Sequence, residues 1–436
     1  MYLDIFLIAV LSFIIAIKLM PKKGVLIAYN LFTLLFLLLL FNKNYSFNFL
    51  GLPFSIYFNG LGYILAIMTN IVLVAITLTL DSFIQFKKDL FYLLYSIVSF
   101  SSLFTFIASN LFSVFIFWEI TEIIIFLSIY IFGGIERRKA AIKFMLFSIL
   151  STTLLLFGLL GIYSQNTSFS IANINNKIIY LSIMCLVIAA MIKIGVVPFH
   201  YWVPDAYQEA PMPITILLAS SISKFGIYLL SFIMPEILGN IVILSWLIIS
   251  ISYVLIIAIS EKSIKKLFSY ISIGELGIIG IAAETGSKSI IMLLSLGHGL
   301  AIASIFLIIG YVILVFDTDN IDKMVATLKY IPNFSYLMII ASFILVGLPT
   351  SSTFFGDLML FIYGFKEFSY IILTIMPLIA IIGGILFYVI EKAFMKKEEL
   401  IYVFYNPMAF YIAIALLISI NLVITFILTD FNLINI

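Results

Sequence analysis

A small set of ionisable side chains interrupts long apolar stretches of this sequence, where a charge is costly. The set comprises Glu119, Glu122, Lys193, Lys224, Glu275, His298 and Asp357. A charged side chain at the middle of a membrane costs about 2.5–3.5 kcal/mol even on the lenient insertion scale. Such residues therefore need a partner or a function. Acids, lysines and a histidine inside apolar segments could pass protons to one another, and proton transfer is the chemistry that this set suggests.

The spacing of these residues suggests that some of them pair. Glu119 and Glu122 lie three residues apart, so on a helix they share one face. Because both signs of charge occur, we expect buried pairing, for instance of Glu119 with Lys193. Pairing lowers the cost of burial, and a change in the protonation of one partner alters how strongly the other holds its proton. Lys193 and Lys224 lie within long apolar stretches, which argues against a purely structural role.

Some of the charged residues have a plainer structural interpretation. Glu122 could be a hydrogen-bonded acid with no transport role, and a lone histidine such as His298 is more often a packing residue. Lys143, Glu284 and Glu391 lie near the ends of apolar runs. We expect these three side chains to reach out to the polar interface.

The composition requires a membrane. Of 436 residues, 64% are hydrophobic and only 10% are charged, and the mean hydropathy is +1.26. In soluble domains, about a quarter of all residues are charged. The net charge of +2 gives no reason to expect nucleic acid. One cysteine, Cys185, and two histidines are too few for an iron–sulfur cluster, a cysteine zinc site or a haem pair, so we expect no metal or cofactor in this chain.

Apolar runs separated by short polar or Gly/Pro breaks indicate about 14 transmembrane helices in a single domain that covers residues 1–436. Continuous apolar runs favour helices over the alternating strands of a barrel. We therefore predict an all-α polytopic membrane protein. Its helices are expected near residues 2–20, 24–42, 55–80, 90–108, 109–132, 139–163, 178–199, 206–233, 238–260, 265–284, 289–315, 333–363, 370–392 and 405–429.

Positive charge is divided unequally between the two sides of this arrangement. If the N-terminus lies outside, the loops after odd-numbered spans contain Lys18, Lys22, Lys23, Lys87, Lys88, Arg137, Arg138, Lys139, Lys143, Lys262, Lys265, Lys266, Lys323, Lys329, Lys392, Lys396 and Lys397. The opposite side holds only Lys43, Lys177, Lys288 and Lys366. Basic loops face the cytoplasm, so both termini are predicted on the non-cytoplasmic side. The first apolar run has no basic residue before it, which speaks against a cleaved signal peptide.

Two of the expected spans contain prolines beside charged residues. Span seven meets Pro198 and Pro204 after Lys193, and span twelve meets Pro349 before Asp357. Proline removes an amide donor and clashes with the preceding turn. Freed backbone persists at membrane depth only inside protein or beside water. The breaks lie an odd number of spans apart, which predicts inverted repeats with broken helices, an arrangement typical of transporters.

Short polar segments outside these spans suggest little chemistry. Asn44-Tyr-Ser46 and Asn166-Thr-Ser168 fit glycosylation sequons, which are common by chance. Asp317, Asp319 and Asp322 form an acidic loop, which we interpret as a solvated loop rather than a calcium site.

One segment resembles a known family. Residues Met191–Pro213, MIKIGVVPFHYWVPDAYQEAPMP, are similar to the central motif of the antiporter-like subunits. These are the NuoL, NuoM and NuoN type subunits of respiratory complex I, the MrpA and MrpD type subunits of sodium/proton antiporters, and their relatives in membrane-bound hydrogenases. The similarity continues through residues 217–226, 117–119, 265–270, 298–300 and 347–357, and so extends over nearly the whole chain.

The resemblance implies a fold of 14 helices with two inverted five-helix repeats. The first repeat covers about residues 90–233 and the second about 238–392; spans one to three (about 1–80) and the last span (about 405–429) flank them. The form without a long lateral helix is closest to the NuoM, NuoN and MrpD types. An acid at position 357 resembles the NuoM-like branch, whereas Ser272-Ile-Gly-Glu275 resembles hydrogenase-type relatives.

The resemblance also implies roles for individual residues. Glu119 corresponds to the glutamate of the charged pair and Lys193 to its partner. Lys224 corresponds to the bridging lysine, His298 to the connecting histidine, and Asp357 to the terminal group of the second repeat. Glu122 and Glu275 are possible helpers. Protons would pass along these residues at mid-membrane.

The function implied is that of a proton-translocating, antiporter-like subunit of a redox-driven complex, either complex I-like or membrane-bound hydrogenase-like, in a prokaryotic plasma membrane. Iron–sulfur, flavin or nickel–iron centres and quinone chemistry would then belong to partner subunits, so whether the chain counts as an enzyme is left open. The expected partners are lipid, further antiporter-like membrane subunits and peripheral redox subunits. One alternative is an Mrp-type Na⁺/H⁺ antiporter subunit without redox chemistry, and another is a non-pumping membrane anchor.

Overall fold

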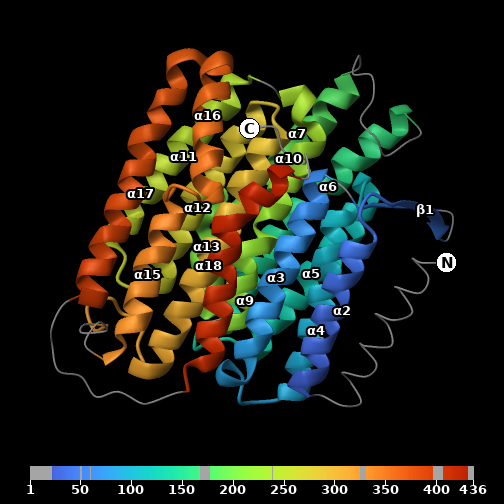
Figure 1. Cartoon of the computed structure of the whole chain (residues 1–436). Coiled ribbons are helices and arrows are strands. Elements are labelled where there is room, and N and C mark those ends of the chain that lie inside the picture. The colour runs from blue at the N-terminus through green and yellow to red at the C-terminus, as the bar shows by residue number, and fades with distance from the viewer. Residues whose placement is uncertain are drawn as a thin grey trace.

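The chain folds into a bundle of long helices that run along one common direction (Figure 1). The computed structural model describes residues 22–49, 52–58, 60–166, 177–237, 239–324, 330–395 and 406–430. Within these ranges, ten helical stretches are long and apolar enough to cross a bilayer, and Tyr180–Ile194 with Phe199–Glu209, which meet at 40°, would make an eleventh. The expected first span, 2–20, lies outside the described residues, and the count of fourteen stays a prediction.

The first part of the bundle follows the expected spans closely. It consists of α2 (Lys23–Leu39), α3 (Gly60–Phe83), α4 (Lys88–Ile107), α5 (Leu111–Phe132), α6 (Arg137–Asn166) and α7 (Lys177–Ile194). The separation of the fourth from the fifth span, at Ala108–Asn110, is clear because Asn110 caps α5 by accepting a hydrogen bond from the Ser113 amide.

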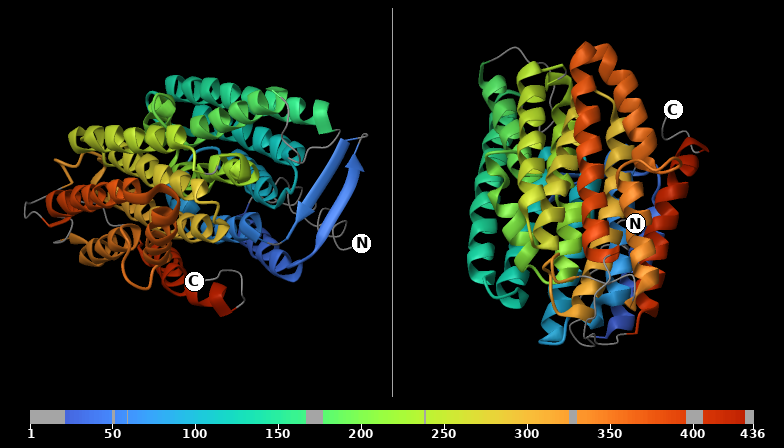
Figure 2. Two further views of the ribbon diagram at one scale, coloured as in Figure 1. Left: turned by 90° about the horizontal axis from the view of Figure 1, so that it is seen from above. Right: turned by 90° about the vertical axis from the view of Figure 1, so that its left-hand side faces the viewer.

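The expectation of a purely α-helical chain is wrong in one segment. Strand β1 (Asn44–Phe49) pairs antiparallel with β2 (Leu52–Tyr57), and the third span begins at Gly60 rather than at residue 55. Polar and aromatic residues alternate along β1, and this period of two is that of a strand. The hairpin stands at one edge of the bundle (Figure 2).

The second part of the chain contains more interruptions. After α7 come η1 (Phe199–Tyr201), α8 (Trp202–Glu209), α9 (Met212–Leu217), the π-helical turn η2 (Leu218–Ile222), α10 (Lys224–Ile237), α11 (Ile241–Ser260), α12 (Ile264–Glu284) and α13 (Lys288–Phe316). The remainder forms α15 (Pro332–Leu345), α16 (Ser352–Phe368), η3 (Ser369–Thr374), α17 (Ile375–Val389), the π-helical turn η4 (Ile390–Met395) and α18 (Met408–Asp430). Figure 1 shows α17 returning beside α16.

The centre of the bundle is formed by α9–α10, α12 and α13. Their apolar windows are 83–94% buried, whereas those of α5, α6 and α18 are only 33–39% buried. Outer helices expose large apolar side chains such as Leu146, Phe157 and Ile256. A helix that is apolar on all sides is stable either in a core or in lipid. The outer surface therefore requires lipid or partner helices.

The basic loops that the structure describes gather at one end of the bundle, the lower end in Figure 1. Contacts tie these loops together: Gln208 donates to Asp319 at 2.6 Å, and Lys392 pairs with Asp322 at 2.5 Å. The alternation of loops that the sequence predicts is thus consistent with the fold. Which side of the membrane this end faces stays a prediction.

A cysteine at position 135 tests the orientation. Ile135 is fully exposed in the loop between α5 and α6, and Asn44 is exposed in the hairpin near the opposite end. With Cys185 replaced by serine, Ile135→Cys should react with a membrane-impermeant maleimide in inside-out vesicles, and Asn44→Cys in right-side-out vesicles. The reverse labelling pattern would invert the predicted topology.

Candidate functional site

The first buried lysine of the site is paired. Lys193, on α7, is 2% exposed, and its ammonium forms an ion pair with the Glu122 carboxylate of α5. The Ser148 hydroxyl of α6 donates to the other carboxylate oxygen at 2.6 Å. The expected pairing of Lys193 with Glu119 is therefore not the one observed. Residues three apart on a helix point about 60° apart, and Glu119 is half-buried towards Thr152 of α6.

Aromatic rings surround the Lys193 ammonium. The ring centroids of Trp202, Phe144, Trp118 and Phe225 lie 5.4, 5.5, 5.9 and 5.9 Å from Nζ. An aromatic face attracts a cation, more strongly where water is absent. The rings therefore stabilise a protonated lysine and keep its ion pair dry.

The second buried lysine contacts a histidine instead of an acid. Lys224 is fully buried at the start of α10, and its Nζ lies 2.7 Å from His298 Nδ1 on α13. It also donates to the Ala219 carbonyl at 3.3 Å. That carbonyl is within reach because η2 is π-helical, and single π-helical turns occur often at functional sites.

The contact between Lys224 and His298 holds one proton. An ammonium has only donors, so the histidine nitrogen must accept when the lysine is charged. The other ring nitrogen, Nε2, lies 3.3 Å from the Ser272 hydroxyl of α12. A second proton on this pair would place two donors face to face, so the two groups cannot both be cationic in this geometry.

The two remaining acids of the set are Glu275 and Asp357. In the described structure, neither bonds directly to Lys224 or His298. Glu275 is 7% exposed one turn after Ser272 on α12 and lies within electrostatic range of both Lys224 and Asp357. Asp357 lies on α16 and is half-buried. In the part of the chain that the structure describes, no hydrogen bond or ion pair joins Lys193 to Lys224, or Glu275 to Asp357. Phe225, whose ring contacts the Lys193 ammonium, directly follows Lys224 in the chain.

Two helix ends followed by left-handed glycines flank this row of charges. Helix α7 ends at Ile194 and is followed by Gly195 with a φ of +84°, and α15 ends at Leu345 before Gly347 with a φ of +98°. Side chains disfavour this left-handed region, so both positions favour glycine. The Trp246 indole donates to the Val197 carbonyl at 2.6 Å, and thereby satisfies backbone freed by the first break.

Of the three side chains expected to reach the interface, Glu284 is buried, whereas Lys143 is partly exposed and ion-paired. Lys143 pairs with Asp205 at the start of α8, and Lys266 approaches the same carboxylate at 3.4 Å. Glu284 is 1% exposed and accepts a hydrogen bond from the Asn240 amide at 3.1 Å, because α11 begins directly beside the end of α12. Glu391 is exposed as expected.

Clefts open at the end of the bundle that carries the basic loops. One of about 500 Å³ is lined by Gln208, Glu209, Lys265 and Asp319, among others, and an adjoining one of about 280 Å³ contains Asp205. The Lys265 ammonium, 7% exposed, donates to the Gln208 carbonyl at 2.6 Å. Polar side chains therefore line the clefts beside the end of α8.

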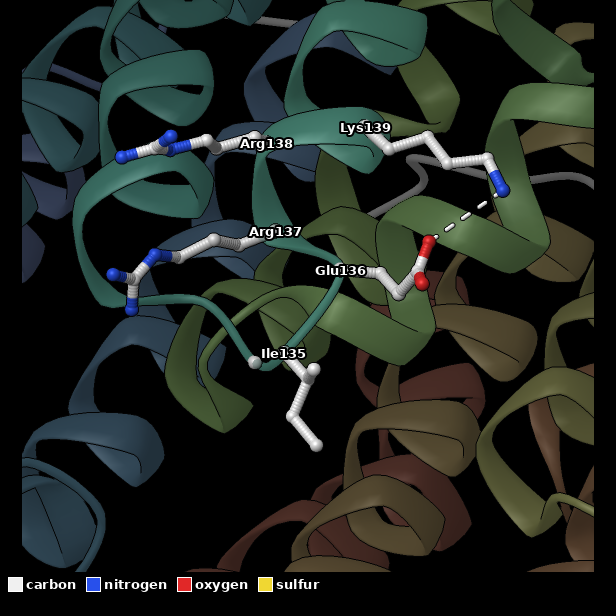
Figure 3. A pocket seen from close by; sticks show the side chains of 6 residues that line it. Ile135, Glu136, Arg137, Arg138 and Lys139 are labelled. Carbon is white, nitrogen blue, oxygen red and sulfur yellow. Dashed lines mark ion pairs between the residues drawn. The ribbon is translucent and has the colours of Figure 1, made fainter.

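The loop between α5 and α6 borders a shallow hollow of about 510 Å³ (Figure 3). Its Lys139 pairs with Glu136 at 3.5 Å, while Arg137 and Arg138 point to the other side. In the acidic loop expected to be solvated, Asp317 and Asp322 are exposed, while Asp319 accepts a hydrogen bond from Ser263 at 2.8 Å. Among the described residues, no group of three or more acids, histidines or cysteines could hold a metal ion.

Long apolar helices with ionisable side chains inside the bundle define an integral, multi-pass membrane protein. The family model described as "NADH:quinone oxidoreductase/Mrp antiporter, TM" matches residues 108–383. The chain therefore belongs to this family, as the resemblance of its motifs predicts.

Individual relatives agree with this assignment. The NADH-quinone oxidoreductase subunit M of Rickettsia typhi is 28% identical over 371 residues, which cover 80% of this chain and 74% of that protein. A chain of respiratory complex I from Thermus thermophilus with bound aureothin has a TM-score of 0.84 at 20% identity, over 98% of this chain and 99% of the other. A chain of the archaeal membrane-bound sulfane sulfur reductase has a TM-score of 0.85 at 20% identity, over 98% and 94%. At this identity, the two structures show a shared fold.

Replacement of Glu122 tests which acid holds Lys193. Removal of one partner of a buried ion pair costs about 3–5 kcal/mol because it leaves an unpaired charge. Glu122→Ala should therefore lower the thermal stability of the purified protein far more than Glu119→Ala does. The double variant Glu122→Met/Lys193→Met should recover most of the loss. Equal destabilisation by the two single variants would mean that Glu119 shares the pairing.

Proposed function

We propose that this chain is a proton-translocating, antiporter-like subunit of a redox-driven membrane complex. The observation that carries the proposal is that Lys193 and Lys224, inside the bundle, each contact a titratable partner on another helix: Glu122 for Lys193, and His298 for Lys224. Ionisable residues of this kind inside a membrane mark ion pathways and proton relays. The family and the name of the Rickettsia relative, a subunit of an NADH-quinone oxidoreductase, support the redox-driven setting.

The relay begins at the ion pair of α5 and α7. Protonation of the Glu122 carboxylate, or of Glu119 nearby, weakens its hold on Lys193. Lys193 then releases a proton towards Lys224, whose chain neighbour Phe225 contacts the Lys193 ammonium. Because no hydrogen bond joins the two lysines in the described structure, we expect this transfer to pass through intervening water.

The relay ends in the second half of the chain. Lys224 and His298 share one proton: a proton taken up by Lys224 moves to the histidine, and Lys224 can take up the next one only after that proton has left His298. Glu275 and Asp357 then receive it, since both acids are within electrostatic range of each other. The pathway therefore uses Glu119, Lys193, Lys224, His298 and Asp357, with Glu122 in the pairing role and Glu275 as a helper.

The architecture proposed for this activity is a pair of inverted five-helix repeats, about 90–233 and 238–392, within a single domain of 14 spans. The two helix ends support it, since each is followed by a left-handed glycine near an ionisable residue: Gly195 after Lys193, and Gly347 before Asp357. Helices broken at corresponding places in two halves are typical of transporter repeats.

Electron transfer is assigned to partner subunits. The chain has one cysteine and two histidines, too few to ligate an iron–sulfur cluster or a haem pair. Iron–sulfur, flavin or nickel–iron centres would lie in peripheral subunits, and further antiporter-like subunits would cover the exposed apolar faces. Coupling between the redox reaction and proton movement would be conformational or electrostatic. The setting proposed is a prokaryotic plasma membrane.

Removal of the Lys193 amine tests the relay directly. Lys193→Ala should remove this subunit's share of proton translocation in membrane vesicles, because the relay then lacks its first amine. Translocation is measured per assembled complex, since the unpaired Glu122 carboxylate lowers stability. The control is Lys366→Ala, which removes an exposed lysine. Proton uptake by Lys193→Ala equal to that of the control would refute the relay.

The second candidate function is that of an Mrp-type Na⁺/H⁺ antiporter subunit, which the family description also includes. Purification with native partners distinguishes it from a subunit of a redox-driven complex. In mild detergent, we expect subunits with redox centres to accompany the chain, as identified by mass spectrometry and by iron content. Small membrane subunits alone, with Na⁺/H⁺ exchange in vesicles, would favour the antiporter.

A further inference from the structure

A buried amide on the last helix bridges the two elements that carry the end of the proposed pathway. Helix α18 is mostly exposed, with only 33% of its window buried, yet Asn421 is fully buried. Its Nδ2 donates to the Gly297 carbonyl of α13 at 2.8 Å, and its Oδ1 accepts from the Ser352 amide of α16 at 3.4 Å. Gly297 directly precedes His298, and Ser352 is in the turn that leads to Asp357.

A second polar contact strengthens this bridge. The Ser352 hydroxyl donates to the Asn421 carbonyl at 3.3 Å, and the Thr425 hydroxyl donates to the Ser352 oxygen at 3.2 Å. Asn421 and Thr425 lie four residues apart and so face the same side of α18. Buried polar groups in a bilayer need partners. Asn421 and Thr425 both bond to Ser352, the first residue of α16.

The helices α13 and α16 approach closely at Gly297 and Thr353. A Cβ on Gly297 would lie 2.6 Å from the Thr353 backbone nitrogen. Thr353 and Asp357 are four residues apart, so Asp357 lies one turn further along the same face of α16. The relative position of His298 and Asp357 is therefore set by backbone contact between their helices and by the amide that bonds to both.

We propose that Asn421 is a positioning residue for proton transfer between His298 and Asp357, held in place from outside the two repeats by α18. The inference rests on the proposed function. Asn421 touches neither ionisable group; it acts through Gly297 and Ser352. Without it, the first turn of α16 would keep the contact between the Ser351 and Thr353 hydroxyls, the bond from the Thr353 hydroxyl to the Ile344 carbonyl of α15 and the contact with Thr425, but it would lose the amide that links it to Gly297 of α13.

The test replaces Asn421 by leucine, which has a similar shape and neither donor nor acceptor. In vesicles that contain the native complex, the number of protons translocated per electron should fall to the value measured for Lys193→Ala, since small misplacements of reacting groups can slow their reaction by about 10²-fold. The rate of electron transfer per assembled complex should fall less. Ser419→Ala, at an exposed position of α18, is the matched control.

Two further measurements keep the outcome decisive. Hydrogen–deuterium exchange should rise at residues 346–357 in Asn421→Leu and stay unchanged in α5. If Asn421→Leu does not assemble, Thr425→Val removes only one hydroxyl and should lower the proton-to-electron ratio in the same direction. A normal ratio in an assembled Asn421→Leu or Thr425→Val complex overturns the proposal. Lys193→Ala, measured in parallel, distinguishes this result from failure of the relay itself, because normal pumping by that variant would refute the relay.

Discussion

A lysine inside a bilayer core needs partners supplied by the protein, and this constraint explains the arrangement of the central helices. Lys193 receives a carboxylate from α5 and aromatic faces from four residues, while Lys224 receives a ring nitrogen from α13 and a carbonyl from its own helix. Each partner comes from another element or from an irregular turn. The packing of α5, α7, α10 and α13 is therefore inseparable from the pairing of these charges.

The same constraint applies to the backbone where the helices break. Freed carbonyl and amide groups at membrane depth need internal partners, and side chains supply them here. The Trp202 indole donates to the Ile192 carbonyl at 3.1 Å, and the Ser250 hydroxyl accepts from the Val197 amide at 2.9 Å. Tryptophan and serine thus stabilise irregular backbone that a soluble protein could leave to water.

Much of this architecture could be predicted from the sequence because apolar length is a strong signal. The bounds of α4–α6 and α11–α13 agree with the expected spans within a few residues, and Lys193, Lys224 and His298 are buried as their apolar surroundings suggest. The family resemblance was confirmed by the comparisons.

The features that could not be predicted are the direction in which a side chain points and the residues that it contacts. Glu119 and Glu122 share one helix face, and only the packing of α5 against α6 and α7 decides that Glu122 meets Lys193. The role of Ser148 gives no signal in the sequence, because serines are common in apolar helices. Asn421 is different: an asparagine within an apolar run already indicates a buried hydrogen bond, although its partners lie 69 and 124 residues away.

The 2.7 Å contact between Lys224 and His298 has a consequence for timing. Two nitrogens at this separation can accommodate a single hydrogen between them. The pair therefore carries one excess proton or none, and never two. Protons therefore pass this pair one at a time, and the next one can enter only after the previous one has left. Throughput at this point is then limited by departure from His298, and raising the proton concentration at the entrance beyond saturation would not accelerate the flow.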